Sequence, residues 1–285
     1  MIDPKLLALA TAITFGLAPV VLKMAFRRGG NTSVGMLVGL LVAVPITFAP
    51  VAFVGLRLAE LTPAAILAFI LGGLAGNAVG RRWNYESINL LGASRATAIR
   101  ASSPVITAVL AAALYDEPVT PLRLAAILAI VAGAVLVTWQ PGSDRRAWLG
   151  IGVLYAFLSA VSYGVRPLFL KFGLQQADLP LEAACIGAVV ALAWGLATED
   201  RSALRLGRLD RSLALFALGG ALVATGLMTL TFGLAGGLVS VVYPITASAP
   251  LFTLVFTAIF LRGVELLNIR IILGVLAVVF GVTYL

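Results

Sequence analysis

The sequence predicts an all-α integral membrane protein with ten transmembrane helices, built as two inverted five-helix repeats around a central cavity. Of the 285 residues, 61% are hydrophobic and only 11% are charged, which is too apolar for a water-soluble domain of this size. The apolar runs are unbroken and about 20 residues long, the length that a helix needs to cross a bilayer core of roughly 30 Å. A motif near the start of the chain also returns in its second half.

Ten apolar segments have the length of a bilayer crossing. The first five expected spans are 6–26, 34–54, 64–89, 93–114 and 122–139. A polar break over residues 140–146 follows, and the other five spans are 149–172, 181–197, 213–234, 238–261 and 269–285. We expect the first span to be a retained helix, because it is longer than the core of a signal peptide and no small-residue cleavage site follows it.

Residues 12–23 return 148 positions later as residues 160–171. The repeat therefore predicts two units, residues 1–140 and residues 147–285. An odd number of spans in each unit places the second unit upside down relative to the first, as in many carriers that work by alternating access. The repeat-matched pairs are Gly16 with Gly164, Pro19 with Pro167, Lys23 with Lys171, Gly39 with Gly187 and Gly133 with Gly281.

Several prolines fall inside the apparent helices, where each removes a backbone hydrogen bond and favours a bend. A bend beside a cavity can act as a hinge, and a static kink is the alternative at each position. The candidate hinges are Pro19, Pro104, Pro167, Pro244 and Pro250.

Charge and cysteine content exclude several classes of protein. The net charge of +8 comes from lysines and arginines that mostly mark helix ends, so we expect no nucleic-acid partner. The chain has no histidine and one cysteine, Cys185, which excludes a disulfide framework and a Cys/His metal site. We expect Cys185 to serve packing, and we expect neither a cofactor nor a catalytic centre.

The loop charges predict an orientation. If both termini face outward, ten loop arginines lie on the cytoplasmic side against Lys5, Arg57 and Arg123 outside. The positive-inside rule then places both termini on the periplasmic side of a bacterial inner membrane.

Seven cations lie within the expected spans, and Glu86 is the one acid that we place among them. An ion at bilayer depth costs about 2.5 kcal/mol or more, so each cation must pair, face a wet cavity or reach the interface. The matched residues Lys23 and Lys171 lie near helix ends, where they either extend to the interface or act as equivalent gates. The other five are Arg81, Arg82, Arg95, Arg100 and Arg166.

Residues 80–89 are the most polar and aromatic part of any span. Arg82 and Glu86 are four residues apart, so one interpretation is an ion pair that neutralises both. The other is a pocket that Asn77, Trp83 and Tyr85 line. Hydroxyls near the prolines of the fourth and ninth spans either cap freed carbonyls or meet the ligand. The further candidate substrate contacts are Ser103, Tyr163 and Tyr243.

The two halves resemble the EamA-type repeat of the drug/metabolite transporter superfamily over nearly the whole chain. The resemblance in the first half lies in Phe15, Gly16 and Lys23, in residues 104–108 and 115–118, and in Gly133; in the second half it lies in Tyr163, Gly164, Lys171, residues 250–253 and Glu265. It implies a cavity built by helices 1, 3, 4, 6, 8 and 9, and a carrier similar to the aromatic amino-acid exporters. It also implies cytoplasmic termini, against the charge count.

These observations predict a monomeric inner-membrane exporter of neutral or aromatic amino acids or related metabolites. Its partners are then a small-molecule substrate and the lipid bilayer. Facilitated movement is the interpretation that we favour, because Glu86 is the sole candidate proton carrier. The alternatives are a broader drug or metabolite carrier, a proton antiporter and a channel. Saturable counterflow would distinguish a carrier from a channel.

Overall fold

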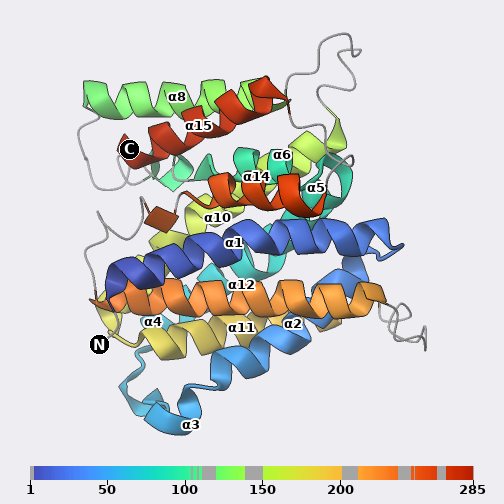
Figure 1. Ribbon diagram of the computed structural model, residues 1–285. Helices are drawn as coiled ribbons and strands as arrows, with labels where there is room; N and C mark the ends of the chain where they lie inside the picture. The colour runs from blue at the N-terminus through green and yellow to red at the C-terminus, as the bar shows by residue number, and fades with distance from the viewer. Residues whose placement is uncertain are drawn as a thin grey trace.

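The computed structural model describes residues 3–103, 105–107, 109–110, 120–138, 150–200, 211–236, 245–246, 248–261 and 268–284. Within these ranges every regular element is a helix (Figure 1). The helices of the first half are α1 (Pro4–Arg27), α2 (Thr32–Phe48), α3 (Val51–Val54), η1 (Leu58–Glu60), α4 (Pro63–Gly72), η2 (Gly73–Gly80), α5 (Arg81–Leu91), α6 (Ala93–Arg100) and α8 (Pro121–Thr138). Those of the second half are α10 (Ile151–Gln176), α11 (Pro180–Thr198), α12 (Arg211–Gly236), α14 (Ala249–Phe260) and α15 (Ile269–Tyr284).

In the described part of the chain, six helical segments are long and apolar enough to cross a membrane. They correspond to the first, second, third, sixth, seventh and eighth expected spans. The six are Pro4–Arg27, Thr32–Val54, Pro63–Leu91, Ile151–Gln176, Pro180–Thr198 and Arg211–Leu230. Shorter apolar helices lie in the fifth, ninth and tenth, while α6 ends at Arg100, before the end of the fourth. The count of ten spans therefore stays a prediction.

Polar side chains start several helices at the points where the apolar runs begin. The Asp3 carboxylate accepts a hydrogen bond from the backbone N–H of Lys5 at 2.8 Å, at the start of α1. The Asn31 side chain accepts from Val34 N–H at 2.8 Å, at the start of α2. Such caps satisfy backbone donors that have no partner within the helix, a need that lipid cannot meet.

The helices α1 and α10, which carry the repeated motif, run in opposite directions. Lys23 near the end of α1 contacts Asn89 near the end of α5. At the start of α10, a Cβ added to Gly152 would lie 2.9 Å from the Leu91 side chain, also at the end of α5. Helix α1 therefore runs parallel to α5 and α10 runs antiparallel to it, which is what an inverted repeat requires.

The repeat-matched glycines Gly16 and Gly164 make equivalent contacts. A Cβ on Gly16 of α1 would lie 2.9 Å from the Ala249 carbonyl oxygen at the start of α14. A Cβ on Gly164 of α10 would lie 2.7 Å from the Ser103 carbonyl oxygen, just after α6. Both distances are shorter than real Cβ contacts, so the two glycines permit the same close approach in the two halves.

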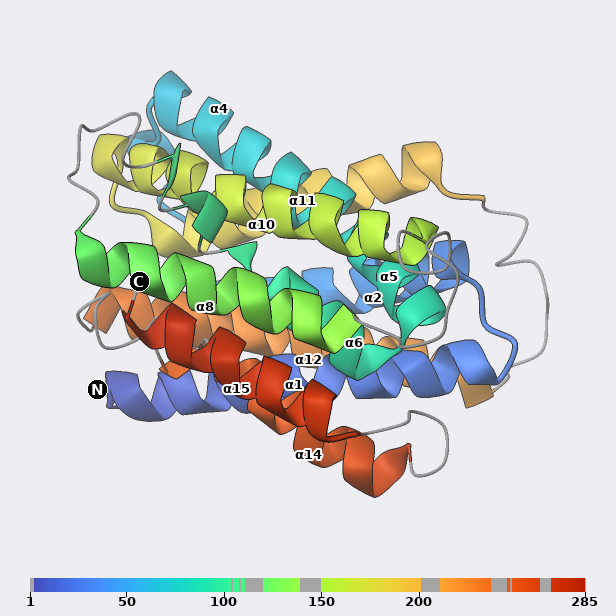
Figure 2. The ribbon, with the colours of Figure 1, turned by 90° about the horizontal axis from the view of Figure 1, so that it is seen from above.

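Two further sets of matched glycines repeat this correspondence. Gly39 of α2 faces Gly220 of α12, and Gly187 of α11 faces Gly73 of η2. On the outer pair of helices, α8 and α15, which lie side by side in Figures 1 and 2, each helix again contributes a glycine. The two glycines and the residues that they meet are Gly133 against Gly274 and Val278, and Gly281 against Ala126 and Ile130.

The third crossing departs from this symmetry through a π-helical segment, η2. Gly73 and Gly80 bound it, whereas the corresponding glycines of α12, Gly220 and Gly226, are one residue closer together. The correspondence of Gly80 with Gly226 rests on their neighbours, Ser162 and Tyr163 in one half and the repeat-matched Thr14 and Phe15 in the other. A π-helical turn accommodates one inserted residue and is frequent at functional sites.

The main apolar core lies where α1, α2, α5 and α12 meet. Phe26, Tyr85 and Phe216 form its centre, with ring centroids 6.4 Å apart for Phe26 and Tyr85 and 5.2 Å apart for Phe26 and Phe216. Both pairs pack edge to face, the geometry that aromatic quadrupoles favour. The core thus contains elements of both halves of the chain.

Neighbouring glycines offer a test of this packing. Replacing Gly73 with alanine should lower the free energy of unfolding by about 1–3 kcal/mol, because the added Cβ would lie 2.8 Å from the Gly187 Cα, which cannot move aside. Gly72→Ala is the matched control, because its Cβ would meet only an ordinary contact at 3.5 Å. Thermal melting of both purified variants measures the difference, and equal melting temperatures would contradict the packing.

Candidate functional site

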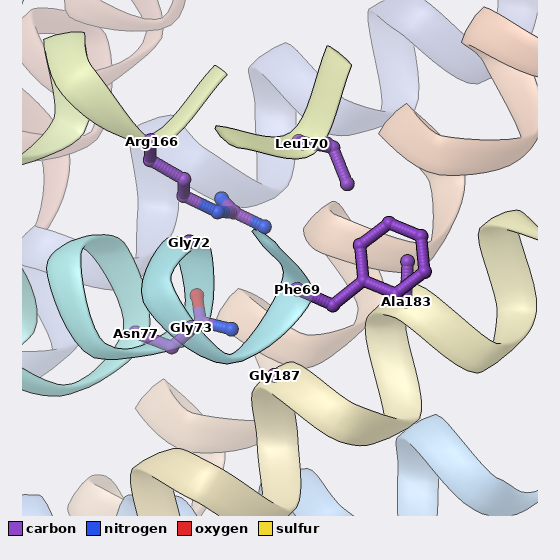
Figure 3. Close-up of a pocket in the computed structure, with 8 residues that line it drawn as sticks. All are labelled: Phe69, Gly72, Gly73, Asn77, Arg166, Leu170, Ala183 and Gly187. Carbon is purple, nitrogen blue, oxygen red and sulfur yellow. The ribbon is translucent and has the colours of Figure 1, made fainter. Parts of the chain in front are cut away.

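A small cavity lies beside the π-helical segment, between η2, α10 and α11 (Figure 3). Its volume is about 20 Å³, room for about one water molecule. Asn77 from η2 and Arg166 from α10 are its polar lining residues, and both side chains turn towards it (Figure 3). A Cβ on Gly76 would overlap the Arg166 side chain, so the guanidinium stem lies directly against the backbone of the segment.

The full lining shows why this space exists. Small residues from η2 and α11 leave room that larger side chains would fill, and two apolar side chains close the other side. The lining residues are Phe69, Gly72, Gly73, Asn77, Arg166, Leu170, Ala183 and Gly187. A Cβ on Gly187 would lie 3.0 Å from the Asn77 side-chain nitrogen, which is tighter than most real Cβ contacts. The glycine at this position therefore leaves room for the Asn77 amide.

The predicted ion pair between Arg82 and Glu86 is confirmed, with 2.6 Å between Arg82 Nη1 and Glu86 Oε1. Arg82 Nε also lies 3.1 Å from Glu199 Oε1. Glu199 follows the last residue of α11, and its side chain is only 2% exposed. Arg82 therefore joins α5 to the end of α11 through Glu199, while its pair with Glu86 stays within α5. Spacing along the chain does not reveal this partner, because Glu199 falls just outside the apolar span 181–197.

Lys23 and Lys171 differ in their surroundings although they are repeat-matched. Lys23 Nζ donates a hydrogen bond of 2.5 Å to the Asn89 carbonyl oxygen. This carbonyl belongs to the last turn of α5, where helix carbonyls lack partners within the helix and attract cations. Lys171 is exposed on α10. A cation thus links α1 to the end of α5.

The aromatic candidates are spread over two places. Tyr85 is 1% exposed and belongs to the apolar core, so it does not line the small cavity, and neither does the half-buried Trp83. Tyr163 of α10 carries the Arg100 guanidinium over its ring, at 5.4 Å from the centroid, a cation–π contact between α6 and α10. Neither tyrosine lines the small cavity beside Asn77.

The hydroxyls near the fourth span have backbone partners. Ser102 Oγ donates to the Ile99 carbonyl at 2.7 Å, as expected for capping. Thr107 Oγ1 lies 2.7 Å from the Gly164 carbonyl oxygen and 3.3 Å from that of Ser103. Ser103 thus contributes its backbone to the junction with α10.

The candidate hinges have different positions. Pro19 and Pro167 lie inside α1 and α10, as expected. Pro250 lies in the first turn of α14, where a missing N–H costs no helical hydrogen bond. Pro104, Tyr243 and Pro244 lie outside the described residues. No cluster of three or more Asp, Glu, Cys or His residues that suits a metal ion occurs in the ranges that the structure describes.

The buried link between Arg82 and Glu199 should stabilise the fold. Glu199→Gln should lower the free energy of unfolding by about 1.5–3 kcal/mol, since a charged hydrogen bond to a buried acid is lost. Glu60→Gln, which disrupts the exposed pair with Arg57, is the matched control and should cost less than about 1 kcal/mol. Melting of the two variants compares them, and equal losses would show that the buried link is no stronger than a surface pair.

Comparison of the sequence and the fold with known proteins identifies the family of this chain. The model of the EamA-like transporter family matches the chain twice, over residues 5–139 and 150–285. No curated protein matches. The crystal structure of another protein is similar in fold, with a TM-score of 0.65 and 18% sequence identity over 97% of this chain and 95% of the other, and this likeness supports the fold alone. The chain therefore belongs to the EamA-like transporter family of multi-pass membrane transporters.

Proposed function

We propose that this transporter exports neutral or aromatic amino acids, or related small amphipathic metabolites, across a bacterial inner membrane as a monomer that works by alternating access. The observation that carries the proposal is the position of Asn77. It lies midway along the 29-residue third crossing, Pro63–Leu91, and is only 7% exposed. A buried amide at this depth, beside Arg166 and a π-helical turn, has the character of a binding site.

The small cavity beside Asn77 represents an occluded state in this proposal. Its volume of about 20 Å³ admits water but not an amino acid. A substrate enters once α10 and α11 separate from η2, so that the cavity grows between the two halves. The glycine contacts at Gly73 and Gly187 permit this movement, because no side chains interlock there.

The interactions of Lys23 and Arg82 form the gate on one side. Lys23 holds α1 to the end of α5, and Arg82 holds α5 to the end of α11. Breaking both frees α5 from its neighbours at this end of the bundle. The repeat-matched Lys171 near the other end of α10 takes the corresponding role in the opposite state, as the inverted repeat requires.

Transport assays test the proposed substrate class. Proteoliposomes that contain the purified chain and are loaded with phenylalanine, methionine or threonine should release these amino acids faster than protein-free liposomes. Uptake of a labelled amino acid should also be driven by unlabelled amino acid inside, because a carrier returns its site by exchange. Equal release rates would remove the substrate class, and non-saturable flux without counterflow would indicate a channel.

The double pairing of Arg82 favours facilitated movement over proton antiport. Both nearby carboxylates are engaged by the same guanidinium, so neither is poised to release and take up protons. Glu86→Gln should therefore keep saturable transport with an unchanged pH profile, because the amide oxygen still accepts from Arg82. A variant that loses its response to an imposed pH gradient, with binding intact, would instead assign proton coupling to Glu86.

A further inference from the structure

Among the residues that the structure describes, three side chains near the middle of the bundle have buried polar atoms without a hydrogen-bond partner. They are Arg81, at Nε and Nη1, Tyr85, at its hydroxyl, and Ser159, at Oγ. Their exposed fractions are 3%, 1% and 0%. A buried polar group without a partner costs roughly 1–3 kcal/mol, and more if it is charged. Native structures contain few such groups, and each calls for an explanation.

The three side chains belong to one region of the fold. Arg81 and Tyr85 are one turn apart on α5, and the Tyr85 hydroxyl lies within electrostatic reach of the Arg81 guanidinium and of Tyr163 on α10. Helices α5 and α10 pack together (Figure 2). Gly80 faces Ser162, and Leu91 faces Gly152. This antiparallel register places Ser159 opposite α5 between these two contacts, within about one turn of Arg81.

The symmetry of the fold shows that the missing partner of Ser159 is specific to this half. Its repeat-matched residue, Thr11 of α1, has a partner: Thr11 Oγ1 lies 2.8 Å from Thr229 Oγ1 on α12. On α5, the position that corresponds to Thr229 is Trp83, by the correspondence of Gly80 with Gly226. The Trp83 indole therefore stands in this half where the Thr229 hydroxyl stands in the other, and Ser159 has no hydroxyl partner at that position.

Arg81 has no acid to neutralise it in the described part of the chain. The two carboxylates bound in this region, those of Glu86 and Glu199, both pair with Arg82. Arg81 lies ten residues, or about 15 Å, before the end of α5, which is close to the middle of a bilayer core of roughly 30 Å. Bulk water and lipid headgroups lie far from this depth, so a molecule bound inside the protein is suited to supply the counter-charge.

We propose that Arg81, Tyr85 and Ser159 form the carboxylate-binding end of the substrate site. A guanidinium donates to a carboxylate with matching geometry and charge, and the two hydroxyls supply neutral donors beside it. One carboxylate, such as that of an amino acid, would neutralise the Arg81 guanidinium. The identification of the substrate as an amino acid rests on the proposed function. The need of Arg81 for a carboxylate does not depend on that function.

Thermal melting of the purified full-length chain in detergent tests the site with three matched probes. Phenylalanine and phenylalaninamide differ at the carboxyl group, and phenylacetate keeps the carboxylate without the amine. Phenylalanine and phenylacetate should raise the melting temperature in a saturable way, and phenylalaninamide should not. Equal shifts with the amide, or no shift with any probe, would overturn the site. The same Arg81-dependent shift with chloride or inorganic phosphate would overturn the assignment to carboxylates.

Variants separate binding from a structural role. Arg81→Met should raise the dissociation constant for phenylacetate at least about tenfold, and Arg81→Lys should raise it less. Ser159→Ala should raise it by an intermediate factor. Without ligand, Arg81→Met and Ser159→Ala should melt at or above the wild-type temperature, because each removes a polar group that has no partner. The reverse pattern, a lower melting temperature with unchanged binding, would assign these residues to the fold and contradict the proposal.

Thr11→Val is the matched control, since it removes the hydroxyl that does have a partner. It should lower the melting temperature and leave phenylacetate binding unchanged. The outcomes also distinguish the two proposals. If phenylacetate binds in an Arg81-dependent way but no amino acid is transported, the carboxylate site stands and the amino-acid substrate is wrong. If amino acids are transported but phenylalaninamide binds as well as phenylalanine, the amino-acid substrate stands and the carboxylate site is wrong.

Discussion

The constraint on which the rest of the structure depends is that the third crossing carries charge and amide groups where lipid offers no partners. Its polar part contains Asn77, Arg81, Arg82 and Glu86, all within the membrane-length segment Pro63–Leu91. Every such group must be solvated by other helices, by trapped water or by a bound molecule. Helices α10 and α11 supply part of this solvation, through Arg166 beside Asn77 and Glu199 beside Arg82. The arrangement of both halves around this crossing follows from that need.

The two halves share one packing scheme, and the candidate site lies where they depart from it. Gly16 and Gly164 meet equivalent carbonyls, as a duplicated and inverted unit requires. The π-helical turn η2 breaks the equivalence by one residue, and the buried Asn77 lies within it. An insertion that disturbs regular helix geometry persists when it has a use, and here it opens a polar space in an apolar interior.

The sequence predicted the all-helical class, the matched glycines and the pairing of Arg82 with Glu86, because each depends on spacing along the chain. The burial of Tyr85 and the pairing of Glu199 were not predictable in this way, because they depend on which helices α5 meets. Charge alone also cannot show that Arg81 Nε and Nη1 have no hydrogen-bond partner among the described residues, while the neighbouring Arg82 pairs with two carboxylates. The division into residues 1–140 and 147–285, ten spans, and the roles of the site residues stay predictions.

The most direct test of alternating access around this crossing is thiol labelling at Asn77 from each side of the membrane. Cys185 is the one native cysteine, so Asn77→Cys in a Cys185→Ser background gives a single reactive position. Ala191→Cys, in the apolar core, is the control that should stay unlabelled. The account predicts that a membrane-impermeant reagent labels the Asn77→Cys variant from either side and that substrate slows the reaction. Labelling from neither side, or from one side alone under all conditions, would contradict it.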